Sequence, residues 1–303
     1  MVKILELFDF TQCVLPEQLF DIKIPQKEID KKIETAAEHF LTIEEQNDAV
    51  RKGDIVAVKI ESSDSFLQSD CARFSAGKGF FSEEIEQAVI GKKKNDTLSL
   101  EVNGSPAQVT ILWVKRRIVP ELTDAMAAEM GIEDVNSVQE YTEYATSELV
   151  EEDKEKKQNA IWLLVSKKLT EDSKFEIDEE EIETQYKRTI TYLRQELADD
   201  FEEFMQVKYH GETLEESKQL LKAEIEKTLK LCAIAKPMAD ENGIEWTEEE
   251  YEAVIDEMVN EEYSREELKQ SMSYEDYVMQ QMEAFLQAAV LEYFDDRFTV
   301  TIV

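Results

Sequence analysis

The sequence has few of the residues that build cross-linked scaffolds, metal centres or nucleophilic catalytic sites. Among 303 residues it holds three cysteines, two histidines, five prolines and eight glycines. The cysteines are too few and too far apart for a disulfide framework or a zinc site, and sparse thiols are typical of a reducing compartment. Neither histidine has a serine or cysteine at motif spacing. The sequence therefore predicts no cofactor and no metal ion.

Long hydrophobic runs are also missing. No stretch approaches the roughly 18 consecutive apolar residues of a membrane-spanning helix. At the N-terminus, Glu6 and Asp9 interrupt the apolar residues, so the hydrophobic region of a signal peptide is not formed. We therefore expect a cytoplasmic protein with no membrane contact.

Basic residues are scarce. The chain has 69 acidic and 34 basic residues, a formal charge of −35. Residues 51–120 carry 11 basic and 9 acidic residues, whereas residues 121–303 carry 18 basic and 49 acidic residues, which predicts a domain boundary near residue 120. An acidic surface repels phosphate groups, so we expect no nucleic acid partner. The acidity keeps the chain soluble, and it also suits a protein that exposes apolar surface or binds basic partners.

Residues 51–118 have the pattern of a small antiparallel sheet. Residues 55–60 resemble a buried strand, and residues 74–79 resemble a short strand that runs into a glycine turn. The alternating residues 97–102 are joined by a turn at 103–106 to a long strand over 108–115. Between them, Ser82 and two following acids predict a helix start, and Gly91 predicts its end. The predicted order is β-β-α-β-β, with the sheet wrapped on one helix.

The remainder is predominantly helical. Pro25 opens a predicted helix, and four long segments repeat apolar residues at helical spacing, over 146–169, 178–205, 213–241 and 274–297. The fold class predicted is α+β, with a small sheet domain and a larger all-α domain.

Three blocks together carry a resemblance to a known family. They are the connector of residues 20–53, the sheet framework of residues 54–118, and the junction Val119-Pro-Glu-Leu-Thr123 followed by Met130-Gly-Ile-Glu-Asp134 and long helices. Their order and spacing resemble the trigger factor family of folding chaperones. The resemblance implies an N-terminal connector over 1–50, an FKBP-type isomerase domain over 51–118, and a helical chaperone domain with extended arms over 119–303. It also implies unfolded or nascent polypeptides as partners, held without ATP.

Two features depart from the family pattern. The family usually begins with a ribosome-docking domain that bears a Gly-Phe-Arg-x-Gly-Lys loop, and this sequence has no such motif. We therefore expect ribosome docking to be absent or arranged differently. In addition, the aromatic positions of the isomerase pocket are largely replaced, since Ile60 and Val109 stand where the family has aromatic rings. The candidate prolyl pocket consists of Ile60, Phe66, Phe74, Phe81, Ile85, Val109 and Trp113, although domain core is the simpler explanation of its aromatic residues.

Aromatic and methionine residues on the predicted helices are candidates for client binding. The resemblance favours this interpretation for Tyr186, Tyr192, Phe204, Met282, Phe285 and Tyr293, although ordinary helix packing explains any one of them. The leading hypothesis is an ATP-independent holding chaperone with a degenerate isomerase domain. Two alternatives stay open: an active peptidyl-prolyl isomerase with a rebuilt pocket, and an acidic helical adaptor for one dedicated partner. The sequence identifies neither the clients nor the oligomeric state.

Overall fold

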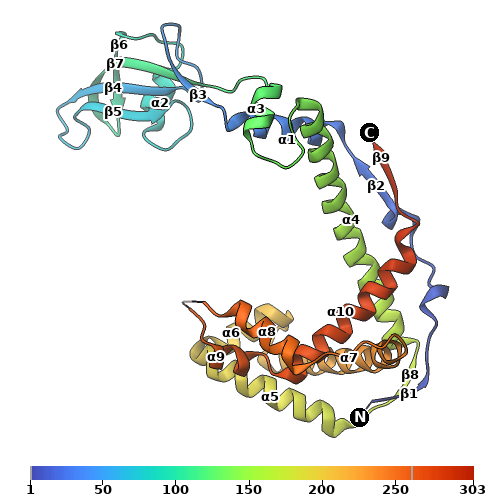
Figure 1. Cartoon of the computed structure of the whole chain (residues 1–303). Helices are drawn as coiled ribbons and strands as arrows, with labels where there is room; N and C mark the ends of the chain where they lie inside the picture. The colour runs from blue at the N-terminus through green and yellow to red at the C-terminus, as the bar shows by residue number, and fades with distance from the viewer. Residues whose placement is uncertain (1, 261) are drawn as a thin grey trace. The chain divides into compact units, whose positions relative to one another are not determined.

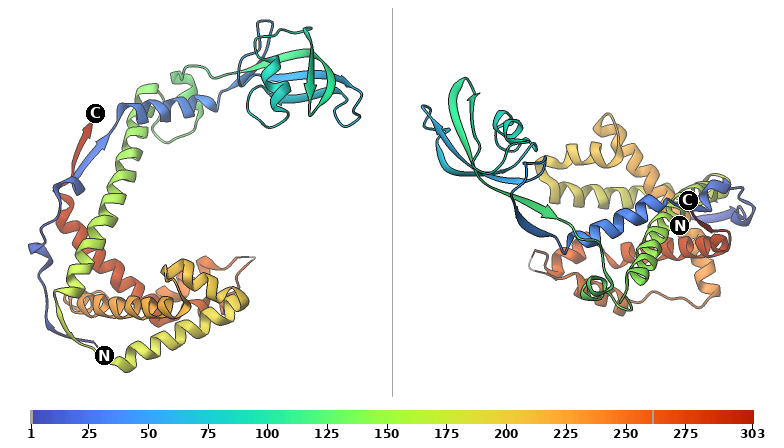
Figure 2. Two further views of the ribbon diagram at one scale, coloured as in Figure 1. Left: turned by 180° about the vertical axis from the view of Figure 1, so that it is seen from behind. Right: turned by 90° about the horizontal axis from the view of Figure 1, so that it is seen from above.

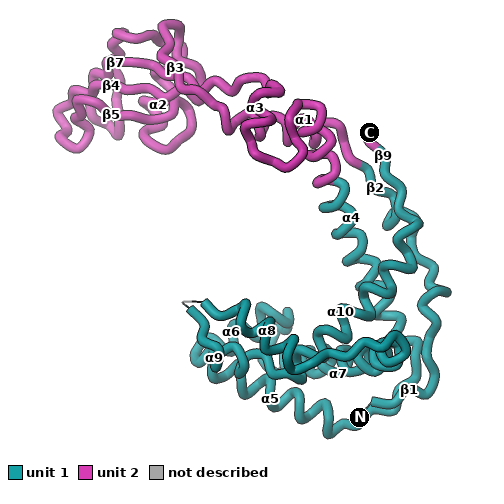
Figure 3. The backbone as a smooth tube through the Cα atoms, in the orientation of Figure 1, with its two compact units in different colours: residues 1–23, 150–301 teal, residues 24–149, 302–303 magenta. Residues whose placement is uncertain are grey.

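The computed structural model describes residues 2–260 and 262–303, and the chain divides into two compact units (Figure 3). Unit 1 comprises Met1–Lys23 and Val150–Thr301, and unit 2 comprises Ile24–Leu149 and Ile302–Val303. Strands and helices occur together, which confirms the predicted α+β class. Within the described residues, no helix combines the length and the apolar character needed to cross a bilayer.

The sheet of unit 2 is organised by one long central strand. The strand β7 (Ser105–Ile118) pairs antiparallel with three others: β3 (Thr42–Gln46), β4 (Ile55–Ser62) and β6 (Thr97–Val102). The strand β5 (Ser69–Ser75) pairs with the other edge of β4. The short helix α2 (Glu83–Val89) packs against this sheet (Figure 1). The predicted β-β-α-β-β order over residues 51–118 is therefore confirmed, but the second strand lies at Ser69–Ser75 and not at residues 74–79, where the chain already turns.

A dry core joins the sheet to α2. Val56, Val58 and Ile60 of β4 are fully buried, together with Ile85 and Val89 of α2. Burial of one such side chain stabilises the fold by about 1.5–3 kcal/mol. The helix begins at Ser82, whose hydroxyl accepts a hydrogen bond from the Ile85 backbone N–H, as its sequence predicts. The core thus fixes α2 over the sheet, and the buried Glu86 carboxylate belongs to the same helix.

A second cluster of unit 2 is helical. It joins α1 (Gln26–Glu38), α3 (Asp124–Glu129) and the first part of α4 (Val138–Glu171). Small residues allow these helices to approach closely, and the buried members are Ala36, Ala127, Val135, Tyr141 and Ala145. The same region is tied by an ion pair between Lys32 and Glu148.

Unit 1 is built around three long helices. The second part of α4 packs with α7 (Leu214–Glu241) and α10 (Tyr274–Asp295), and two views show α7 alongside both α5 (Glu179–Leu197) and α10 (Figures 1 and 2). Shorter helices complete the unit: α6 (Phe201–Tyr209), α8 (Glu248–Met258) and α9 (Arg265–Ser271). The strand β1 (Lys3–Glu6) pairs with β8 (Lys174–Glu176), and β2 (Asp21–Ile24) pairs with β9 (Thr299–Ile302).

The N-terminal segment contributes to the core of unit 1. Phe20, only 2% exposed, packs against Phe294 of α10, and the Arg297 guanidinium lies 3.8 Å from the centre of the Phe20 ring. Buried residues of α4, α7 and α10 complete the cluster: Ile161, Val165, Leu169, Leu231, Ile234, Ala235, Leu286 and Val290. Two distant parts of the sequence therefore form one hydrophobic core.

The helix predicted over residues 178–205 is wrong in one respect, because it is not continuous. It breaks after Leu197 at Ala198, which has φ 43° and ψ −110°, and a short 3-10 turn (Ala198–Asp200) leads into α6. The break turns Phe201 and Met205 back toward Leu221, and all three become buried. Burial of these large side chains offsets the unfavourable backbone at Ala198.

Candidate functional site

Four adjoining cavities lie along α7 and α10 in unit 1. Their volumes are about 190, 450, 520 and 410 Å³, and neighbouring cavities share lining residues. Met279 lines three of them and Met282 lines two. Together they form a groove whose walls come from α5, α7 and α10, which we call the α5–α7–α10 groove.

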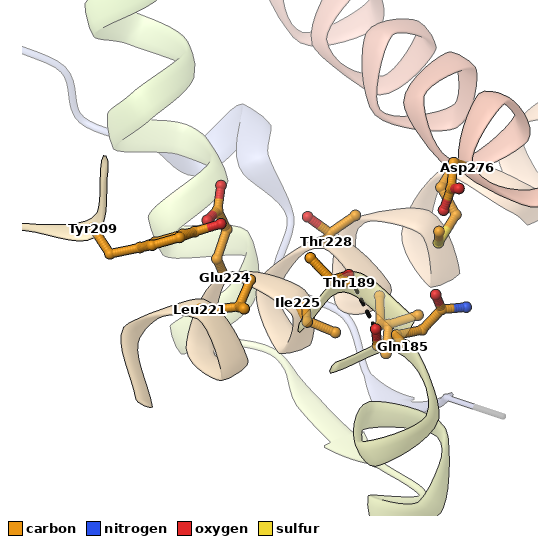
Figure 4. A pocket seen from close by; sticks show the side chains of 10 residues that line it. Gln185, Thr189, Tyr209, Leu221, Glu224, Ile225, Thr228 and Asp276 are labelled. Carbon is orange, nitrogen blue, oxygen red and sulfur yellow. Dashed lines mark hydrogen bonds between the residues drawn. The ribbon is translucent and has the colours of Figure 1, made fainter. Parts of the chain in front are cut away.

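The floor of this groove is apolar. In its smallest cavity, Leu221, Ile225 and Leu229 of α7 face Met279 of α10. Figure 4 shows Leu221 and Ile225 in the middle of this cavity. On the α5 side, the Thr189 hydroxyl donates to the backbone carbonyl of Gln185 at 3.0 Å, so its polar group is already satisfied. An apolar side chain of a bound polypeptide would be desolvated here without leaving these groups unpaired.

Acidic groups surround the apolar floor. Tyr209 and Glu224 lie together at one end of the smallest cavity and Asp276 lies at the other (Figure 4). Burial raises the pKa of Tyr209 to about 12, and the charge of Glu224 adds to this rise, so the phenol stays protonated and can donate a hydrogen bond. Burial also raises the pKa of Glu283, where Glu224 raises it further although Lys227 lowers it. Three cations, Arg188, Lys208 and Lys236, also line the cavities, but the carboxylates outnumber them, so the rim is acidic overall and favours basic over acidic ligands.

The chemistry of the groove is suited to binding. Methionine side chains are flexible and polarisable, so Met279 and Met282 can adapt to side chains of different shapes. Among the residues described, no three His, Cys, Asp or Glu side chains are grouped as a metal site would require. The arrangement offers adaptable apolar contact with an acidic rim.

The structure brings together two of the six client-binding residues predicted from the sequence. Tyr192 and Met282 both line the groove. The other four do not line the groove. Tyr186 lies beneath Lys222 in the cluster of α5, α6 and α7, and Phe204 lies beside Lys208. Phe285 packs edge-on against Trp246, and the exposed Tyr293 packs edge-on against Phe10. The sequence analysis missed Met279, although its i, i+3 spacing from Met282 on one helix was a usable signal.

The candidate prolyl pocket is only partly assembled. Four of its residues meet in the core of the sheet: Ile60, Phe74, Ile85 and Val109. Phe81 stacks on Phe74 with ring centres 5.0 Å apart. Phe66 is 98% exposed in the connection between β4 and β5, so it does not join them.

Trp113 also lies apart from this core. Trp113 on β7 pairs with Ala57 on β4, and Ala57 pairs with Arg73 on β5. The Arg73 guanidinium lies 5.8 Å from the centre of the Trp113 ring. Lys115 approaches the same ring at 5.1 Å. Because successive side chains of a strand point to opposite faces, Trp113 shares the face of Arg73, opposite to that of Phe74.

A buried carboxylate shapes the loop beside Phe81. Glu86 of α2 accepts hydrogen bonds from the backbone N–H groups of Lys78, Gly79 and Phe81, at 2.6, 2.7 and 2.8 Å. Burial by itself would raise the pKa of Glu86, but these hydrogen bonds outweigh it and lower the pKa. The sequence analysis did not single out Glu86, because an acid in the first turn of a helix is usually exposed.

Comparisons with known proteins give a consistent result. A family model described as "Bacterial trigger factor protein (TF) C-terminus" matches residues 137–293. Trigger factor of Macrococcus caseolyticus is 25% identical over 264 residues, which cover 78% of this chain and 60% of that protein. Trigger factor of Shouchella clausii is 26% identical over 61% of this chain and 45% of its own length. The chain thus spans less than two thirds of either relative.

Another trigger factor matches a larger share of this chain, and one solved structure is also similar to it. Trigger factor of Staphylococcus epidermidis is 24% identical over 90% of this chain and 70% of that protein. A solved structure titled "Promiscuous Substrate Recognition in Folding and Assembly Activities of the Trigger Factor Chaperone" covers 98% of this chain and 73% of its own, with 20% identity and a TM-score of 0.48.

Proposed function

Because the chain belongs to the trigger factor family, we propose that it is a folding chaperone that holds unfolded polypeptides in the α5–α7–α10 groove. The observation that carries the proposal is the position of Met279, which borders three adjoining cavities over an apolar floor. Contacts of this kind are weak one at a time, and several along one groove add up to useful affinity. No nucleotide is needed, and the acidic rim disfavours nucleic acid. The proposed working place is the cytoplasm.

The roles that we propose for the domains of this chain follow those of the family. Residues 1–50 act as a connector, residues 51–118 as an FKBP-like domain, and residues 119–303 as the chaperone domain. In the FKBP-like domain, Ile60 and Val109 are at most 1% exposed and fill the space near α2. A prolyl ring would have to displace them, so the proposed role of this domain is an auxiliary contact and not fast isomerisation.

A second candidate function is peptidyl-prolyl isomerisation. One observation favours it: Phe81 is 48% exposed and stacked on Phe74, in a loop that Glu86 holds in place. A partly exposed aromatic pair could receive a prolyl ring at the surface of the domain, where it would desolvate the amide bond.

One refolding experiment separates the two functions. A model protein whose refolding is limited by proline isomerisation is refolded with and without the full chain, and light scattering is followed together with the slow phase. The holding function predicts suppressed scattering and an unchanged slow phase. Accelerated refolding would establish the isomerase instead. Unsuppressed scattering at a several-fold excess of the chain would contradict the holding function.

A further inference from the structure

The helix α5 forms one wall of the groove, but it is attached less firmly than the helices that form the other walls. It has 19 residues and none of them is fully buried, whereas α7 and α10 each bury several. Its apolar stripe consists of Tyr186, Ile190, Leu193 and Leu197, all half-buried against the cluster of Phe201, Met205 and Leu221. A stripe at i, i+4, i+7 and i+11 is that of an amphipathic helix lying on an apolar surface. Half-buried side chains contribute less per residue than the fully buried ones of α7 and α10, so α5 is the least firmly attached of the three helices.

Polar contacts at the helix surface supply part of the attachment. Arg188 donates hydrogen bonds to Ser273 and Glu275, at 2.6 and 3.1 Å, and forms an ion pair with Asp276. Lys222 of α7 forms an ion pair with Glu183, and its ammonium group lies 4.5 Å from the Tyr186 ring centre. Because the Arg188 side chain is 38% exposed, salt screens its ion pairs and they are weak.

The C-terminal end of α5 is strained. Ala198 has a φ of 43°, which non-glycine residues rarely adopt, and its ψ of −110° lies outside the usual left-handed region. This conformation is imposed by the docking of α5 and α6 on α7, so release of α5 would relax it. The helix is thus attached by a shallow apolar stripe and exposed ion pairs, and its docking is opposed by backbone strain.

We propose that α5 occupies a docking site for amphipathic helices, and that it gives way to a helical segment of a client. The site is the surface of α6, α7 and α10 that α5 covers. Its ligand is a helix with apolar residues at the spacing of the α5 stripe and a basic residue two positions after the first of them. That basic residue would replace Arg188 opposite Glu275 and Asp276, as charge complementarity requires. This inference rests on the proposed holding function and identifies the form of its client.

The test loosens α5 in the full chain by the substitution Arg188→Gln. The control Lys167→Gln removes the same charge from an exposed ion pair with Glu171 on α4. Hydrogen exchange of residues 180–197 measures release of α5. Binding of a fluorescent peptide with the sequence of residues 179–197 measures access to the site, against a scrambled peptide of the same composition. Hydrogen exchange of the wild type is also measured at increasing NaCl concentrations, because salt weakens the same ion pairs without any substitution.

In Arg188→Gln we expect both the hydrogen-exchange rate of residues 180–197 and the peptide affinity to increase roughly three- to tenfold. This is the size of effect that the loss of one partly exposed ion-pair network produces. The Lys167→Gln control is unchanged, the scrambled peptide does not bind, and NaCl increases the exchange of the wild type. Unchanged exchange and affinity in Arg188→Gln, or equal binding of both peptides, would overturn the inference even if the wild type suppresses aggregation. If α5 responds as expected but no variant suppresses aggregation, the docking site stands and the holding function fails.

Discussion

Asp54 and Arg116 form a two-point ion pair inside unit 2. The Arg116 Nε and Nη2 groups donate to the two carboxylate oxygens of Asp54, at 2.8 and 2.7 Å, and the Arg51 backbone N–H donates to the same carboxylate. Asp54 is 3% exposed. Burial by itself would raise its pKa, but Arg116 and the Arg51 N–H outweigh this and lower the pKa. The pair therefore ties the start of β4 to β7.

Substitution of Asp54 should strongly destabilise the sheet. Asp54→Asn keeps the shape of the side chain but removes the buried counter-charge of Arg116, which then retains the partly exposed Asp48 as its acidic partner. We expect a loss of about 3 kcal/mol in the free energy of unfolding. Urea unfolding of the full chain, followed by tryptophan fluorescence, measures it. Asp70→Asn, at an exposed position on β5, is the matched control and should change the stability by less than about 0.5 kcal/mol. Equal stability of the two variants would refute the structural role of the pair.

The pH dependence of unfolding should report Glu86. Its pKa is lowered in the folded state from an ordinary value of 4.5. An acid with a lowered folded pKa contributes stability that is complete above the unfolded pKa and is lost as the pH falls through the folded pKa. We therefore expect stability to fall steadily below about pH 4.5, and to fall less steeply in Glu86→Gln. Urea titrations between pH 3 and 7 measure the slope. Identical slopes for wild type and variant would show that the carboxylate does not hold the loop.

Glu283 should change the pH dependence of unfolding in the opposite direction to Glu86. Burial raises the pKa of Glu283 in the folded state, because the ionised form is disfavoured there. The contribution of Glu283 to stability therefore declines as the pH rises from its unfolded pKa to its folded pKa. We expect Glu283→Gln to stabilise unit 1 by about 0.5–1 kcal/mol at pH 7, with a smaller gain at pH 4. Thermal unfolding at both pH values measures this. The exposed Glu292 on the same helix serves as control through Glu292→Gln, and an equal gain there would mean that net charge alone is responsible.

The methionines of the groove should be needed for holding clients. The double substitution Met279→Ser and Met282→Ser removes adaptable apolar surface from the adjoining cavities, and we expect the concentration of chain that half-suppresses aggregation to rise roughly fivefold. Met258→Ser, on an exposed residue outside these cavities, should have no effect. Light scattering of a refolding model protein gives the values. If the control variant loses as much activity as the double variant, clients are not held in the groove.

The sheet was predictable because its signals are local. Alternation along residues 97–102, the turn predicted at 103–106 and the cap at Ser82 each depend on residues that lie close together in sequence. The structure has the strand and the cap, and its turn is shorter than predicted because Ser105 and Pro106 already pair with β6. The groove was not predictable, because Thr189, Ile225 and Met279 meet only through tertiary packing. The break at Ala198 was hidden for a related reason. Alanine favours helix, and only the burial of Phe201 and Met205 makes its unusual backbone favourable.

The contact between Phe20 and Phe294 bears on how the chain folds during synthesis. Phe20 is synthesised well before its partner Phe294 on α10, which lies far along the chain. The five strands of the sheet around β7 all end by residue 118, so this sheet can form while unit 1 is still unfinished. Domains fold as units during translation, and exposed apolar segments that wait for a late partner are prone to aggregate. A chain that we propose to hold unfolded polypeptides therefore passes through an aggregation-prone state itself.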